Sequence, residues 1–226
     1  RKYWIMHPET VYQKLLEKGN KNFTNGTISL DRARAVYLFN EEQNKFIENS
    51  LQKRSNFDIQ DIRILLSRQK LKQYKSDSNF TSFEIPKDFF SFVNVEVVAS
   101  NGICGSVKML PVQIKPENIQ EILSDEFNKP SFEFREIPYT IEGNTIKLFT
   151  DNFTVDSVHL NYYRYPTQFD IEGYVDEFGN GSINVAPEFE DRIVDRIISM
   201  CITSFDINNE NFNKLQADIN RVVSKL

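Results

Sequence analysis

The sequence contains 226 residues, of which 40% are hydrophobic and 26% are charged. This length corresponds to one large domain or two small ones, and 19 Phe with 9 Tyr supply enough apolar surface for a packed core. The formal net charge of -5 excludes a protein that binds nucleic acid or anionic membranes over its whole surface, because such proteins carry an excess of cations.

The two cysteines, Cys104 and Cys201, are far apart and belong to no cluster with metal-ligand spacing. Two free thiols fit a reducing compartment better than a disulfide framework, although a single bridge between them stays an alternative. No apolar run approaches the ~20 residues that span a membrane, and the apolar stretch after Arg1 is too short for a signal peptide. We therefore expect a protein of the cytosol with no structural zinc and no membrane partner.

The first third of the chain is expected to be helical. Pro8 is suited to the first turn of a helix that Gly19 ends, and Ser29 or Asp31 can cap a second helix that runs to about residue 54. Asp58 begins a third. Apolar side chains of the second and third helices recur at helical spacing: Val36, Phe39, Phe46, Ile47, Leu51, Ile59, Ile62, Leu65 and Leu66. Two amphipathic helices joined by so short a break should pair as a hairpin.

The middle of the chain has the pattern of strands. Strands are expected at 80–85, 92–98, 103–113, 132–137, 145–149 and 157–165, with a short helix within 116–127. Glu142-Gly143-Asn144 makes a hairpin turn between two of them. Short strands with regularly spaced turns favour a small antiparallel sandwich or barrel.

A final helical region follows the strands. Pro187 and Glu188 open it, an apolar stripe runs from Phe189 to Phe205, and a terminal helix spans 212–223. The predicted fold class is α+β: a helical bundle from the N- and C-terminal helices with an inserted antiparallel β-sandwich or barrel. The predicted helical domain comprises 1–78 and 173–226, and the β-rich domain 79–172.

The sequence offers little catalytic equipment. It has two histidines, His7 at a helix entry and His159 in a strand, and neither adjoins a nucleophile motif. The loop 176–182 superficially resembles a calcium loop, but Pro187 stands where that motif needs a bidentate Glu. No phosphate-binding Gly-rich loop occurs. The sequence predicts no enzyme, no metal site and no cofactor.

Two charged clusters have a structural and a functional interpretation. Acidic residues from Glu188 to Asp195 alternate at i,i+4 spacing with Arg192 and Arg196, which favours a solvated or partner-facing helix over acid–base catalysis. The basic stretch Arg63, Arg68, Lys70, Lys72 and Lys75, with Tyr74, favours a solvated helix end over contact with nucleic acid.

Three segments carry a resemblance to a known family. They are 83–90 (Phe-Glu-Ile-Pro-Lys-Asp-Phe-Phe), 160–166 (Leu-Asn-Tyr-Tyr-Arg-Tyr-Pro) and 185–194, in which Pro-Glu-Phe-Glu enters a helix. Their order resembles the head-to-tail connector proteins of tailed bacteriophages, most of all the adaptor or tail tubular protein A group of short-tailed phages. The Asn-, Lys- and Ile-rich composition resembles ring proteins of crAss-like phages. The resemblance spans about 29 to 205, with a longer connection at 101–130.

The resemblance implies a structural virion protein without a catalytic site. Such proteins form a homo-oligomeric ring, commonly a dodecamer, between the portal protein and the next tail or ring protein. Genomic DNA passes through the lumen without sequence-specific binding during ejection. The implied location is the portal–tail junction of the virion, after assembly in the host cytoplasm. A mildly acidic wall would let DNA slide past.

The residues expected at an interface are exposed aromatics and charges: Trp4, Tyr162, Tyr163, Tyr165, Glu188, Asp191, Arg192 and Arg196. Two alternatives from other classes remain at this point. One is a carbohydrate- or ligand-binding module in which Tyr163 and Tyr165 stack on sugar rings. The other is a hydrolase that uses the acids between Glu188 and Asp191.

Overall fold

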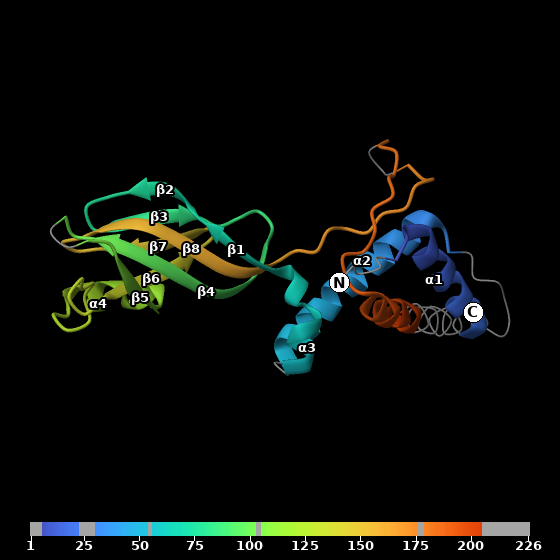
Figure 1. Cartoon of the computed structure of the whole chain (residues 1–226), viewed down its shortest axis with the longest axis horizontal. Coiled ribbons are helices and arrows are strands. Elements are labelled where there is room, and N and C mark those ends of the chain that lie inside the picture. The colour runs from blue at the N-terminus through green and yellow to red at the C-terminus, as the bar shows by residue number, and fades with distance from the viewer. Residues whose placement is uncertain (1–5, 23–29, 54–55, 103–104, 176–178, 205–226) are drawn as a thin grey trace, which may run out of the picture. The chain divides into compact units, whose positions relative to one another are not determined.

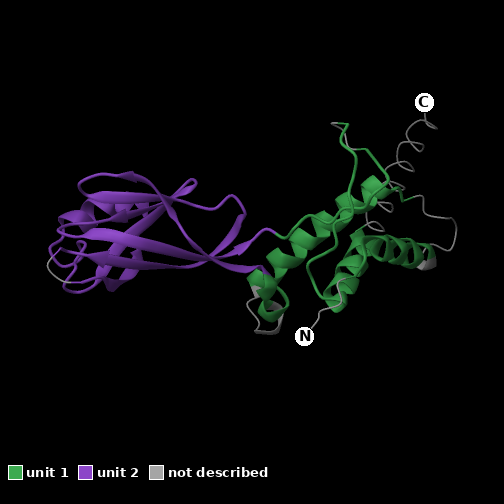
Figure 2. Cartoon of the chain, turned by 45° about the horizontal axis from the view of Figure 1, so that its top comes forward, with its two compact units in different colours: residues 1–64, 166–226 green, residues 65–165 purple. Residues whose placement is uncertain are grey.

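The chain forms two compact units (Figure 2). The structure, a computed structural model, describes residues 6–22, 30–53, 56–102, 105–175 and 179–204. Unit 1 comprises 1–64 and 166–226, and unit 2 comprises 65–165. Both ends of the chain thus belong to unit 1, and unit 2 is an insertion in it. Trp4, Cys104 and the expected terminal helix lie outside the described residues.

Unit 1 contains the helices α1 (Pro8–Asn22), α2 (Arg32–Lys53) and α3 (Asn56–Asp61), and residues 191–204 are also helical. Pro8 occupies the first turn of α1, where its missing N–H needs no partner. α1 continues past Gly19, because a buried glycine is tolerated inside a helix at a modest cost. Asp31 caps α2: its carboxylate accepts the N–H of Arg34 at 2.7 Å.

Residues 166–175 and 179–190, which follow unit 2 in the chain and which we call the return segment, pack on α2 in part. Phe169 has no exposed surface and lies against Phe39, with ring centroids 4.6 Å apart. The side-chain amide of Asn40 donates to the Phe169 carbonyl at 2.9 Å and accepts the Phe169 N–H at 2.8 Å. One side chain of α2 therefore satisfies both backbone groups of a buried, non-helical residue.

Replacing Asn40 with Ala is expected to destabilise unit 1. The Phe169 N–H and carbonyl would be left buried without partners, at a cost of about 2–4 kcal/mol in the free energy of unfolding. Urea unfolding followed by circular dichroism measures the change. Asn49→Ala, at an exposed position of the same helix, is the matched control and should stay within about 0.5 kcal/mol of the wild type. Equal stability of the two variants would contradict this account of Asn40.

Unit 2 is a curled eight-stranded sheet, a half-barrel (Figure 1). Its strands are β1 (Leu66–Lys70), β2 (Lys72–Ser76), β3 (Phe80–Glu84), β4 (Phe89–Ser100), β5 (Val107–Gln113), β6 (Glu136–Glu142), β7 (Thr145–Phe149) and β8 (Thr154–Arg164). The spatial order is β1-β8-β4-β5-β6-β7-β3-β2. β5 and β6 are parallel, and the other neighbouring pairs are antiparallel.

The core of unit 2 lies on the concave side of the sheet. Side chains that alternate along the strands fill it, among them Val97, Ile137, Ile146, Leu148 and Leu160, each at most 1% exposed. The two edge strands, β1 and β2, are consecutive in sequence and are separated by Leu71 alone, whose side chain is buried in this core.

The parallel pair explains the long connection between β5 and β6. Parallel neighbours cannot be joined by a tight turn, so the chain crosses over through a 3-10 turn (Pro116–Asn118) and α4 (Ile119–Ser124). By contrast, β6 and β7 are joined by the expected hairpin turn, in which Gly143 has the left-handed φ of 56° that favours glycine.

The predicted fold class is wrong. The chain is built mainly on a curled mixed sheet with few helices, and not on a helical bundle made by both ends of the chain with an antiparallel sandwich inserted. The third predicted helix ends at Asp61, and the chain is already in β1 at Leu66. The strand predicted at 132–137 is mostly a turn, and β6 begins at Glu136.

Candidate interaction surfaces

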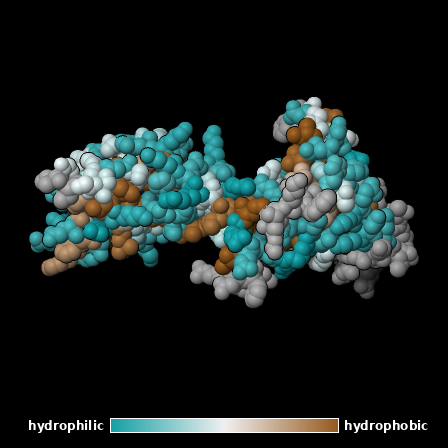
Figure 3. All heavy atoms as spheres, in the orientation of Figure 1, coloured by the Kyte–Doolittle hydropathy of each residue, from teal (hydrophilic) through white to brown (hydrophobic). Residues whose placement is uncertain are grey.

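The two most exposed large apolar side chains of the described residues lie at one end of unit 2, with a third exposed apolar side chain beside them. Phe127 is 89% exposed, Phe134 is 74% exposed and Leu110 is 60% exposed. We call these three residues the aromatic end. Phe127 follows α4, Phe134 precedes β6 and Leu110 belongs to β5. In Figure 3, apolar side chains gather at the end of unit 2 where α4 lies.

The turn after α4 holds Phe127 in its exposed position. Asp125 accepts the Phe127 N–H at 2.9 Å and the Asn128 side-chain amide at 2.5 Å. These hydrogen bonds, that of Phe127 foremost, lower the pKa of the Asp125 carboxyl, since they stabilise its charged form. The turn therefore fixes the backbone, and the apolar side chain extends into solvent.

A second tight turn presents Phe134. Ser131 and Glu136 form an isolated antiparallel bridge, and the Phe134 N–H donates to the Ser131 hydroxyl at 3.2 Å. Arg135 adopts a left-handed φ of 58°, which a residue with a Cβ rarely does, and its carbonyl accepts the Leu110 N–H at 2.5 Å. This strained turn thus places Phe134 beside β5, where Leu110 is exposed.

A hollow of about 930 Å³ lies next to the aromatic end. The partly buried Phe132 and the buried Phe153 form an aromatic pair in its wall, with centroids 6.0 Å apart, and Phe127 and Phe134 also line it. Charged residues lie in the same wall: Glu126, Lys129, Glu133, Arg135 and Asp151. An apolar centre with charged residues around it is the usual anatomy of a protein interface.

The three tyrosines expected at an interface have different environments. Tyr162 is 1% exposed and belongs to the core, where its hydroxyl donates to Asp88 at 2.9 Å. Burial is the main cause of the raised pKa of Tyr162. Tyr163 is partly buried. Tyr165 is 49% exposed, and its ring packs edge-on against that of Phe90, with centroids 4.8 Å apart. The expected exposure of Tyr162 is therefore wrong, because its side chain belongs to the core.

The charged cluster at the start of the last described helix is linked to the rest of unit 1. Arg192 donates to Asp61 at 2.5 Å, and Arg196 lies 3.7 Å from the same carboxylate. Glu188 accepts a hydrogen bond from Thr167, whereas Asp191 is exposed. The two arginines therefore join helical residues 191–204 to α3.

A cleft of about 430 Å³ lies beside this ion-pair network. Residues from both sides of the network line it: Gln60, Asp61, Arg63, Ile64, Glu188, Phe189, Glu190, Arg192 and Ile193. Asp61 is the most enclosed of its charges, with only 10% of its side chain exposed, and both arginines already neutralise it. The enclosed charge in this cleft is thus paired within the chain.

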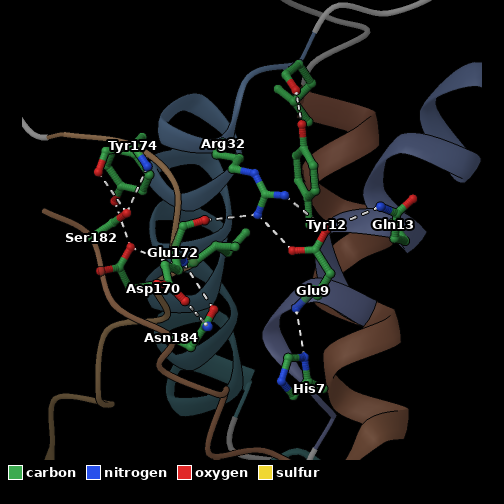
Figure 4. A network of polar contacts seen from close by, with 12 residues as sticks. His7, Glu9, Tyr12, Gln13, Arg32, Asp170, Glu172, Tyr174, Ser182 and Asn184 are labelled. Carbon is green, nitrogen blue, oxygen red and sulfur yellow. Dashed lines mark hydrogen bonds and ion pairs between the residues drawn. The ribbon is translucent and has the colours of Figure 1, made fainter.

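A second polar network fixes the return segment against the helices (Figure 4). Arg32 of α2 forms two hydrogen bonds with the Glu9 carboxylate, at 2.7 and 3.1 Å, and donates to the Glu172 carbonyl at 3.0 Å. Its guanidinium also lies over the Tyr12 ring, 5.0 Å from the centroid. Asp170 holds the two sides of the return segment together through Tyr174 and Ile183.

Acidification is expected to weaken the Glu9–Arg32 contact. The hydrogen bond from Arg32 is the main cause of the lowered pKa of Glu9, so the contact stabilises the folded state above the ordinary pKa and is lost as pH falls through the lowered one. When the pH is lowered below about 5, the free energy of unfolding of Glu9→Gln should therefore fall less than that of the wild type. Denaturation midpoints measured across this range test it, with Glu17→Gln as the exposed control on α1.

The described residues contain no group of three or more His, Cys, Asp and Glu side chains that could hold a metal ion. His7 accepts the Glu9 N–H at 3.3 Å, and His159 lies opposite Glu96 and Lys70 in the sheet. Cys201 is buried, and this burial raises the pKa of its thiol. Within the ranges that the structure describes, no helix has the length and apolarity to cross a bilayer.

Sequence reasoning missed the aromatic end. Phe127 and Phe134 stand in a sequence with 19 phenylalanines, several of which are core residues, among them Phe39, Phe153 and Phe169, so composition gave no reason to single the two out. The signal that was present is their setting: Phe127 follows Asp125-Glu126 directly, and Phe134 lies between Glu133 and Arg135. An isolated Phe between charged residues does not fit a buried strand.

No protein-family model matches the chain, and a search of curated proteins finds no match.

Proposed function

We propose that the chain is a non-enzymatic structural subunit of a homo-oligomeric ring, located between the portal and the tail of a tailed-phage virion. The family resemblance of the segments 83–90, 160–166 and 185–194 supports this setting. The ring would join the portal protein to the next tail or ring protein and surround the DNA channel.

The observation that carries the proposal is the aromatic end. Phe127 and Phe134 are among the costliest side chains to leave in water, and each is more than 70% exposed. Tight turns fix the backbone at both residues, so little backbone entropy is lost when a partner covers their side chains. Contiguous exposed apolar surface of this kind marks a protein–protein contact.

A ring requires contacts between unlike surfaces. Each subunit presents one surface to the neighbour on one side and a different surface to the neighbour on the other, and the rotation between copies must close. The aromatic end is at one extremity of unit 2, and unit 1 carries its own exposed apolar residues, Tyr37, Val175 and Ile183. The chain thus has more than one surface with which to meet a neighbour.

Molar mass in solution tests the proposal. Light scattering should give a discrete multiple of the 26.5 kDa chain, either for the protein alone at high concentration or after mixing with the portal protein. A protein that stays monomeric and leaves the portal unbound at every concentration would contradict the proposal.

A further inference from the structure

Positive charge is concentrated on the edge strands β1 and β2. Residues 66–76 contain four cations and no acid, whereas the rest of unit 2 contains seven cations and thirteen acids. We call Arg68, Lys70, Lys72, Tyr74 and Lys75 the basic stripe. All five are exposed, and Tyr74 is 72% exposed.

Strand alternation places the cations on the outer face. Leu71 is buried in the core, and Gln69 stands opposite the buried Leu160 within hydrogen-bonding distance of the Tyr162 hydroxyl, so both positions are on the inner face of the strand. Arg68, Lys70 and Lys72 then share the outer face, with neighbouring side chains roughly 6.5–7 Å apart. The centroid of the Phe80 ring, on β3, lies 5.7 Å from the Nζ of Lys75 and 4.3 Å from the Nζ of Lys147, which belongs to β7.

Acids of the chain compensate little of this charge. Arg68 pairs with Glu96 at 2.9 Å. Among the residues that the structure describes, Lys70 and Lys72 form no ion pair, although Glu84 stands opposite Lys72 in the sheet. A lysine on an edge strand protects against pairing with other sheets. That role does not explain the exposed Tyr74, or Lys147, which lies on an inner strand.

We infer that the basic stripe binds the phosphodiester backbone of nucleic acid without reading its sequence. Lysine and arginine contact phosphates as cations, and a tyrosine hydroxyl can donate to a phosphate oxygen. The inference rests on the proposed function for its setting, a DNA channel, but the binding is a property of the single chain. In a ring, repetition of the stripe would strengthen a weak contact.

Fluorescence anisotropy with two duplex DNAs of unrelated sequence tests the inference on the full chain. The wild type should bind both equally, and its binding should weaken as salt rises. The double variant Lys70→Gln/Lys72→Gln should lose at least about tenfold in affinity, and the slope of log affinity against log salt should fall by about 1.8. Lys87→Gln/Lys115→Gln removes two exposed cations elsewhere in unit 2 and should leave binding unchanged.

Three results would overturn the inference: no binding at low salt, equal losses in the two double variants, or equally tight binding of polyglutamate, which would point to an acidic protein partner. Light scattering on the same samples separates this test from that of the ring. A monomer that binds duplex through the stripe would refute the ring alone, and a ring that binds no duplex would refute the stripe alone.

Discussion

Replacing Phe127 and Phe134 together with serine is expected to raise the dissociation constant of the contact between subunits by at least about 100-fold. Both side chains would be buried in the assembled state, and each loses about 1.5–3 kcal/mol of apolar transfer free energy when it is truncated. Because both are exposed in the single chain, the stability of unit 2 should change by no more than about 0.5 kcal/mol. Light scattering over a concentration series measures the shift.

The matched control removes an exposed aromatic from unit 1. Tyr37 is 69% exposed, so Tyr37→Ser changes a comparable area far from the aromatic end in sequence. Circular dichroism on all variants verifies that the sheet is intact. If Phe127→Ser/Phe134→Ser assembled as the wild type does, the aromatic end would not be a contact between copies.

The second large effect is expected from Phe39→Ala in unit 1. Phe39 has no exposed surface and packs against Phe169, so its removal leaves a cavity beneath the return segment and costs about 3–5 kcal/mol in the free energy of unfolding. Each unit has its own buried core, and the loss should therefore be confined to unit 1.

Hydrogen exchange read by mass spectrometry distinguishes the two units. In Phe39→Ala, amides of α1 and α2 should lose protection, while those of β4 and β8 should keep it. Leu148→Ala, which truncates a fully buried side chain of unit 2, should show the reverse. Loss of protection in both units from either change would show that the units unfold together.

The sequence predicted those elements whose local pattern matches their burial. In β7, buried Ile146 and Leu148 alternate with Lys147, and this strand lies where it was expected. Asp31 was a predicted cap of α2, and its carboxylate does accept an N–H there. At such positions, local propensity and tertiary packing favour the same structure.

The edge strands could not be predicted in this way. β1 has Ser67 and Gln69 on its inner face, where an amphipathic strand would have apolar residues. The Gln69 side-chain oxygen lies within hydrogen-bonding distance of the buried Tyr162 hydroxyl. Ile62 and Leu65 just before it are buried and continue the helical spacing, so the periodicity extended the helix wrongly into β1. The same misassignment led the basic stretch, which the sequence does single out, to be interpreted as a solvated helix end and not as the surface of two edge strands.

The architecture of the sheet depends on contacts that have no local signature. Parallel pairing of β5 with β6 follows from the crossover through α4, and nothing in the sequence of either strand distinguishes it from an antiparallel pair. Likewise, Arg135 adopts its left-handed φ inside the turn that the Ser131–Glu136 bridge closes, and its carbonyl accepts the Leu110 N–H, against the preference of the residue itself.

The proposed ring can be observed by cryo-electron microscopy of the protein mixed with the portal protein that it is proposed to bind. We expect a closed ring of identical subunits on that portal, with Phe127 and Phe134 of each subunit covered by the next. A single copy bound without rotational symmetry, or a ring in which both phenylalanines face solvent, would contradict it.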